Sequence, residues 1–128
     1  MKPLFIEATK STPKIEYNPE LRIVKINGQS FPENAYKFYE PIFVWLDELL
    51  KELNDELIVD FNLLYFNTSS SKCLINLIDN LEDAYNNNKK ITINWHYDID
   101  NDSARECGEE FKEDVKLPFN ILPIETES

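Results

Sequence analysis

Apolar and polar residues alternate along several segments of this chain, as they do in strands with one buried face. Residues 91–97 (Ile-Thr-Ile-Asn-Trp-His-Tyr) are the clearest example, and residues 57–64 form a nearly continuous apolar run. A turn signal at residues 18–20 (Asn-Pro-Glu) separates two shorter segments and predicts a hairpin. Pro118 places the last segment at a sheet edge. The predicted strands are residues 14–17, 21–26, 57–64, 91–97 and 117–122.

Helical spacing of apolar residues fills the gaps between these strands. A long helix is predicted from residues 31–34 to Leu53, and Pro41 within it predicts either a kink or a short first helix followed by the main one. A second helix follows the strand at 57–64. The acidic segment 98–114 predicts a loop and a third helix that carries Phe111.

The resulting order, ββαβαβαβ, predicts one α/β domain over residues 1–128, with residues 1–10 as a loosely ordered lead-in. Strand–helix–strand units imply parallel neighbours and the hairpin adds an antiparallel pair, so the sheet is mixed, with about five strands. Sheets covered on both faces have strands that are apolar throughout. Two strands here instead carry a polar face, which predicts helices mainly on one side of the sheet and an open docking surface on the other. The polar residues are Asp60, Asn62, Thr92, Asn94 and His96.

The net charge of the chain limits the kinds of partner that it is expected to bind. The 24 acidic and 13 basic residues give a net charge of −11, which would repel nucleic acid and anionic membranes. No apolar run reaches the roughly 18 residues of a membrane span, and residues 1–4 do not open a secretory signal, so we expect a cytoplasmic protein. Cys73 lies on the apolar stripe of the second helix, and Cys107 makes no paired motif with it.

Four consecutive hydroxyl residues, Thr68 to Ser71, lie between the predicted strand at 57–64 and the second predicted helix, at the start of that helix. Free N–H groups and the helix dipole favour an anion at such a position. The plainer interpretation is that these hydroxyls cap the helix, a role that contributes about 1 kcal/mol. The alternative is a phosphorylation site, with Lys72 one turn on either pairing with the phosphate or simply solvated.

The acidic segment has a partial calcium motif. Four of its acids occupy relative positions 1, 3, 5 and 12 of an EF-hand loop. Ser103 replaces the glycine of position 6 and Arg105 stands where an apolar residue is usual, so a solvated acidic face that could meet a basic partner is the competing interpretation. The four acids are Asp98, Asp100, Asp102 and Glu109.

Catalytic chemistry has little support in the sequence. His96 is the only histidine, and with two cysteines it cannot complete a four-ligand zinc site. The chain has two glycines and no phosphate-binding loop. An enzyme would require His96 to meet Asp60 or Asp98 in a pocket. We therefore expect a protein with no enzymatic activity and no cofactor.

Five motifs together resemble the SiaC family of bacterial regulatory phosphoproteins, over about Ser11 to Ile124. They are Ser11-Thr12-Pro13; Pro32-Glu33-Asn34-Ala35 with Phe38-Tyr39; the segment Tyr65 to Lys72; Trp95-His96-Tyr97; and Gly108-Glu109 with Phe111. The resemblance implies a fold similar to STAS domains and a partner-switching role. In that role a dedicated kinase phosphorylates a threonine, a PP2C-type phosphatase removes the phosphate, and the unmodified form activates a diguanylate cyclase in cyclic-di-GMP control of biofilm formation or aggregation.

The resemblance puts the phosphothreonine on Thr68, with Ser69 and Ser70 as alternative acceptors. The family's stretch after Trp-His-Tyr is more uniformly acidic, so the partner of this chain can differ. The rival hypothesis is a module that binds calcium or a small ligand through residues 98–109. The expected partner-binding residues are Asn67, Ser69, Ser70, Ser71, Lys72, Asp60, Asn62 and His96.

Overall fold

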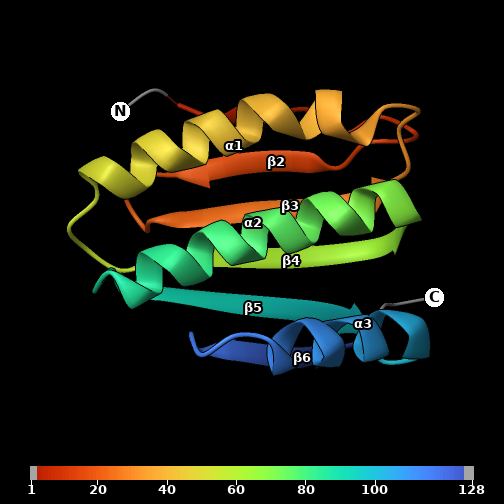
Figure 1. Ribbon diagram of the computed structural model, residues 1–128. Helices are drawn as coiled ribbons and strands as arrows, with labels where there is room; N and C mark the ends of the chain where they lie inside the picture. The colour runs from red at the N-terminus through yellow and green to blue at the C-terminus, as the bar shows by residue number, and fades with distance from the viewer. Residues whose placement is uncertain (1–2, 126–128) are drawn as a thin grey trace.

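The computed structural model describes residues 3–125 and shows a six-stranded mixed sheet with three helices (Figure 1). The strands lie in the sheet in the order in which they occur in the chain. This confirms the single-domain mixed α/β architecture. The elements are β1 (Phe5–Ile6), β2 (Lys14–Asn18), β3 (Ile23–Ser30), α1 (Ala35–Glu52), β4 (Leu57–Phe66), α2 (Thr68–Asn86), β5 (Ile91–Asp98), α3 (Asp102–Glu113) and β6 (Phe119–Ile124).

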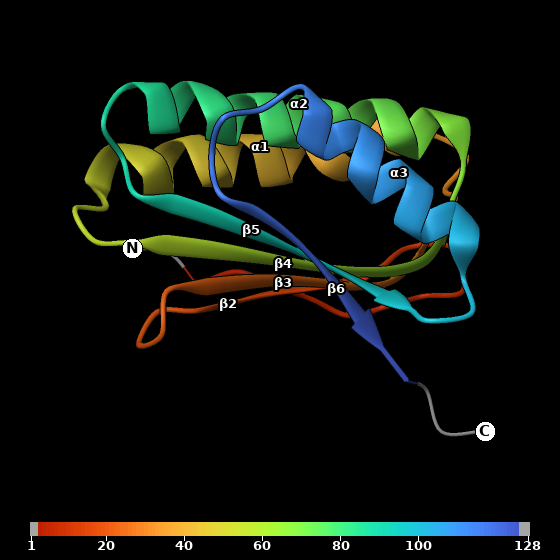
Figure 2. The ribbon, with the colours of Figure 1, turned by 90° about the horizontal axis from the view of Figure 1, so that it is seen from below.

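All three helices lie on the same face of the sheet, as Figure 2 shows. The pairs β1–β2 and β2–β3 are antiparallel, whereas β3–β4, β4–β5 and β5–β6 are parallel. Each parallel pair is joined through one helix, and each crossover steps one strand in the same direction across the sheet. Because such crossovers are right-handed, the helices must all fall on one side. The predicted open face is confirmed.

The prediction of a loosely ordered lead-in is wrong for part of residues 1–10. Phe5 and Ile6 form β1, which pairs with Glu16 and Ile15 of β2 and raises the strand count from five to six. A two-residue strand is too short to show a period, so its pairing depends on the hairpin beside it. Residues 1–2 lie outside the described residues.

The short separate helix considered before Pro41 does not form, because α1 runs continuously from Ala35 to Glu52. Proline removes one backbone N–H and its ring crowds the preceding turn. Pro41 points to solvent, so water can reach the carbonyl that loses its partner. Opposite Pro41, the buried side chains of Tyr39, Ile42 and Trp45 hold the helix against the sheet.

Alternating burial along β4 and β5 creates the core between the sheet and the helices. Leu57, Val59, Phe61 and Leu63 of β4 point inward, each 3% exposed or less. The residues between them face the open side. Cys73 is buried among these apolar side chains, and this burial raises the pKa of its thiol. It packs as a small apolar residue, as its position on the helix predicted.

A tryptophan and a glycine join α3 to the sheet. The indole Nε1 of Trp95 donates to the Ala104 carbonyl at 2.9 Å, and Phe111 packs edge-on against the ring at 5.3 Å. A Cβ on Gly108 would lie 2.5 Å from Cδ1 of Trp95, so no larger residue fits there without displacement. One residue from each of two sequence motifs, Trp95 and Gly108, therefore positions α3.

Candidate functional site

The start of α2 is fixed by Asn67, which is the cap in place of the hydroxyl residues considered for that role. Its side-chain oxygen accepts from the Ser70 N–H at 2.9 Å, and its carbonyl accepts from the Ser71 N–H at 2.9 Å. Its own N–H donates to the Ser30 carbonyl at the end of β3. By helix geometry, the N–H groups of Thr68 and Ser69 then point out of the helix end, where an anion would meet them.

The four hydroxyl residues after this cap have different environments. Thr68 and Ser69 are exposed, Ser71 is half-buried and Ser70 is fully buried. A kinase must reach the hydroxyl that it modifies, so the structure favours Thr68 and Ser69 over Ser70 as acceptors. Burial equally removes Ser70 from the residues that a docked partner can touch. Lys72 is exposed four residues after Thr68, on the same side of the helix.

Ser70 belongs to a buried hydroxyl network that sequence analysis did not identify. Ser30 Oγ donates to Ser70 Oγ at 2.8 Å and lies 2.7 Å from the Tyr39 hydroxyl. Burial raises the pKa of Tyr39 to about 12, although the hydrogen bond to Ser30 acts in the opposite direction. The network joins the end of β3, the helix α1 and the first turn of α2. It therefore fixes where Thr68 lies.

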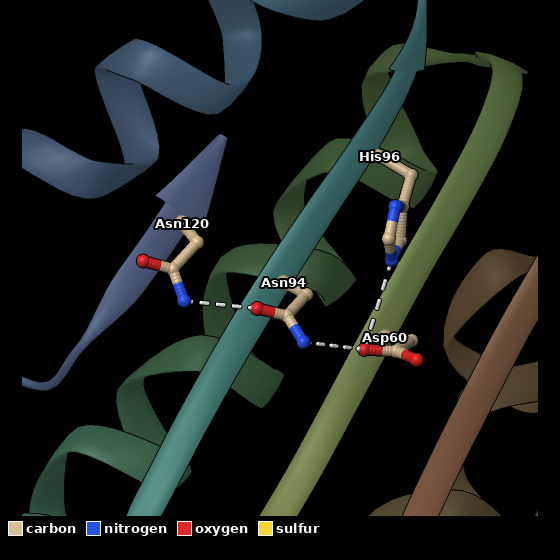
Figure 3. A network of polar contacts seen from close by, with 4 residues as sticks. All are labelled: Asp60, Asn94, His96 and Asn120. Carbon is tan, nitrogen blue, oxygen red and sulfur yellow. Dashed lines mark hydrogen bonds and ion pairs between the residues drawn. The ribbon is translucent and has the colours of Figure 1, made fainter. Parts of the chain in front are cut away.

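The open face carries the second group of predicted residues, in an ordered polar network (Figure 3). One carboxylate oxygen of Asp60 accepts from Asn94 Nδ2 at 2.9 Å and lies 3.8 Å from His96 Nε2. Asn94 in turn accepts from Asn120 Nδ2 at 3.0 Å. Asn62 pairs in register with His96 on the neighbouring strand. Asp60 and His96, which an enzyme would require to meet in a pocket, thus lie close together on the open sheet face.

The polar side chains on the open face form a row across neighbouring strands, which we call the polar row. The sequence analysis did not identify two of its members, because only the strand register shows that they belong to it. Lys25 lies beside Asp60 across the parallel pair β3–β4, and Asn120 lies beside Asn94 across β5–β6. Each occupies an alternating position on its strand, facing the open side. The members of the polar row can be identified once the strand order and register are known. The alternation of apolar and polar residues does not by itself give the register between segments that are distant in the sequence.

The acidic segment does not form an EF-hand loop. Asp98 ends β5, Asp100 lies in the turn, and α3 already begins at Asp102. Glu109 lies within α3, where it forms an ion pair with Arg105 at 3.1 Å. Among residues 3–125, no group of three or more His, Cys, Asp or Glu side chains is placed to hold a metal ion.

The fold and the two sites together define the class of this protein: a small α/β domain that exposes a hydroxyl residue at a helix start and a polar network on its open sheet face. The model of the SiaC family regulatory phosphoprotein matches residues 6–124. The chain therefore belongs to the SiaC family.

Several relatives support this assignment. An uncharacterized protein of Pseudomonas aeruginosa strain UCBPP-PA14 is 36% identical over 121 residues, which cover 94% of this chain and 96% of that protein. The crystal structure of apo-SiaC from P. aeruginosa has a TM-score of 0.88 at 35% identity and covers 95% of this chain and 99% of that one.

A third relative comes from a complex. In the crystal structure of the diguanylate cyclase SiaD with its activator SiaC from P. aeruginosa, the matching chain is 36% identical with a TM-score of 0.89. It covers 94% of this chain and 99% of that chain. Separately, no helix in the described part of the present chain is long and apolar enough to cross a membrane.

Proposed function

We propose that this chain is a non-enzymatic partner-switching protein whose binding to a diguanylate cyclase is controlled by phosphorylation of Thr68. The observation that carries the proposal is the position of Thr68: an exposed hydroxyl on the first residue of α2, directly after a cap that leaves two N–H groups pointing outward. The family membership and the complex of SiaC with SiaD support the choice of effector.

A phosphate at Thr68 would cost the fold little. It adds about −1.5 to −2 charges and three acceptor oxygens, and the N–H groups and dipole of α2 stabilise negative charge at that point. The first turn of α2 carries no acidic residue that would repel it. The modification would therefore act on what the surface binds and leave the fold unchanged.

The proposed docking surface extends from the start of α2 onto the open face. Asn67, Ser69, Ser71 and Lys72 surround Thr68, whereas Ser70 is excluded by its burial. Leu64 joins this region to the polar row, because it is the next residue after Asn62 on the open side of β4. Asp60, Asn62 and His96 would then contribute polar contacts to the same partner.

The other partners follow from the resemblance to the family. A dedicated serine/threonine kinase adds the phosphate and a PP2C-type phosphatase removes it, in the cytoplasm, with cyclic-di-GMP and biofilm formation as the output. His96 and Asp60 serve as contact residues in this scheme. No cofactor is involved.

The test uses the SiaD-like cyclase of the source organism and measures its affinity and activity with two forms of the chain. The unmodified form should bind and activate the cyclase, and the form fully phosphorylated at Thr68 should bind at least about tenfold more weakly. Thr68→Ala treated with the same kinase is the matched control and should keep its binding. Equal affinity of the phosphorylated and unmodified forms would refute the switch.

A further inference from the structure

A groove opens between the end of β4 and the start of α3. The ladder between β4 and β5 ends at the pair Asn62–His96, yet β4 continues to Phe66 beside β3. Helix α3 lies on the far side of the gap, and Asn101 spans it by donating to the Leu64 carbonyl at 3.1 Å. The space has a volume of about 300 Å³ and is lined mainly by Leu64, Tyr65, Phe66, Asn101, Ala104 and Cys107.

The β4 side of this groove is apolar and exposed. Leu64 and Tyr65 keep 51% and 55% of their surface accessible, and the Tyr65 ring lies 5.9 Å from the half-exposed ring of Phe31. Large apolar side chains that gather on the surface of a highly charged protein indicate a contact site for another molecule.

The surface next to this groove is acidic, although none of the acidic residues that the structure describes lines the groove itself. A neighbouring hollow of about 500 Å³ shares Leu64, Asn101 and Ser103 with the first and adds three aspartates, Asp98, Asp100 and Asp102. Among the described residues that line the two hollows there is no lysine or arginine. The surface thus presents exposed apolar side chains beside three carboxylates.

We infer that this groove binds the effector through a segment that presents an apolar side chain followed by lysine or arginine residues. The inference rests on the proposed function and names the surface and the partner chemistry. The apolar side chain would cover Leu64 and Tyr65, and the cations would meet the three aspartates. Complementary charge of this kind speeds association and selects the partner.

The position of Thr68 explains how phosphorylation would act on this groove. Thr68 follows Phe66 by two residues, so its Cα lies within about 8 Å of the groove wall. In the chain it directly follows the apolar residues of the β4 end, whereas the three aspartates belong to the end of β5, the turn after it and the start of α3. A dianion there would have to lose water when an apolar side chain docks, and that desolvation is unfavourable.

Two substitutions in the unmodified full-length chain test the groove, each with a matched control. Leu64→Ser removes an exposed apolar contact, and Val44→Ser does the same on α1, where Val44 is 54% exposed. Asp100→Lys reverses an exposed charge beside the groove, and Asp47→Lys makes the same change on α1. Helix α2 lies between α1 and α3 (Figure 1), and no residue of α1 lines the groove.

The readout is the dissociation constant for the SiaD-like cyclase, with thermal melting as the check on folding. Leu64→Ser should weaken binding about tenfold. Asp100→Lys should weaken it about fivefold at low salt and much less near 0.5 M salt, where charges are screened. The loss caused by phosphorylation should depend little on salt, because it arises from desolvation. Both α1 controls should bind like the wild type.

The outcomes separate the two proposals. If phosphorylation weakens binding but the two groove variants bind like their controls, the groove is refuted and the switch stands. If the groove variants lose affinity while phosphorylation has no effect, the groove stands as a docking site and the switch is refuted. A wild-type chain that does not bind the cyclase refutes both. Should Leu64→Ser fail to fold, Asp100→Lys in its exposed turn still decides.

Discussion

Helices α2 and α3 begin with the same kind of side-chain cap and differ in the charge of their first residue. Each is capped by an asparagine, Asn67 or Asn101, whose side chain accepts from the N–H three residues on, at 2.9 and 3.1 Å. The first residue of α3 is Asp102, a permanent carboxylate at the positive end of the helix. The first residue of α2 is Thr68, and its first turn carries no acid.

The comparison shows that a helix start can carry a negative charge permanently, as α3 does, or be able to accept one, as α2 is. Negative charge at this position stabilises a helix by about 0.3–1 kcal/mol, and α3 carries that charge permanently. Helix α2 has the same cap and the same outward N–H groups without the charge. A phosphate on Thr68 would supply it, so the start of α2 is compatible with a neutral and a charged state.

The two helices also differ in how they are attached to the sheet. Helix α3 packs through the close contact between Gly108 and the Trp95 indole. Helix α2 is fixed at its start by the buried hydroxyl network of Ser70, Ser30 and Tyr39. The first attachment depends on shape and the second on hydrogen bonds, so they should respond to different perturbations.

The largest expected effect is on the attachment of α3. Gly108→Ala places a methyl group against a ring that is 1% exposed and held by its bond to Ala104. Such overpacking costs about 1–3 kcal/mol, and we expect a loss of about 2 kcal/mol in the free energy of unfolding. Urea denaturation followed by tryptophan fluorescence measures it.

The control for this substitution lies in the same helix. Ser103→Ala changes an exposed residue near the start of α3 and should alter stability little. Glycine to alanine in an open helix position would by itself stabilise by about 1 kcal/mol. A Gly108→Ala protein that is more stable than the wild type would therefore show that the Trp95 contact does not hold α3.

The attachment of α2 should instead respond to high pH. Burial raises the pKa of Tyr39 to about 12 from 10.0, so the native state keeps the neutral phenol longer than the unfolded chain does. Its contribution is complete below pH 10 and is lost as pH rises toward 12. Tyr39→Phe loses a buried hydrogen bond, which contributes about 1 kcal/mol, and the stability of this variant no longer depends on the titration of residue 39.

The difference in unfolding free energy between wild type and Tyr39→Phe is the quantity to measure. Near pH 8 the wild type should be the more stable protein, and between pH 10 and 12 the order should reverse, with a total change of about 2 kcal/mol. Tyr36→Phe, at an exposed tyrosine on the same helix, corrects for the titration of other groups. A constant difference across this pH range would contradict the buried network.

The sequence predicted most of this fold because its main elements are long and strongly periodic. Residues 57–64 and the helix after them fell close to the observed β4 and α2. The failures have physical causes. Phe5 and Ile6 form too short a strand to show a pattern. Pro41 does not divide α1 into two helices, because it lies on the solvent side of that helix.

The sequence predicted where the site lies along the chain, but not which of its side chains are buried and which are exposed. Four hydroxyls at a helix start were identified, but their burial was not. A usable signal existed: Ser70, Leu74, Leu77 and Leu81 follow helical spacing, which places Ser70 on the inward stripe. Its partners Ser30 and Tyr39 could not be found this way, because only the packing of distant elements brings them together.

The smallest effect is expected when the first residues of the two helices are exchanged, and this exchange tests the comparison directly. Thr68→Asp adds a carboxylate at the start of α2 and should stabilise the protein by about 0.5 kcal/mol, whereas Asp102→Thr should destabilise it by a similar amount. Both effects arise from a charge near free N–H groups, so both should shrink as salt screens the field. Urea denaturation at low and high salt measures the change.

Position along the helix supplies the decisive control. Asn86→Asp adds the same charge at the last residue of α2, where the dipole disfavours it, and should destabilise the protein. If Thr68→Asp and Asn86→Asp have the same sign, the added charge acts only through the net charge of −11. Opposite signs would show that the start of α2 favours a negative charge that Thr68 does not itself carry.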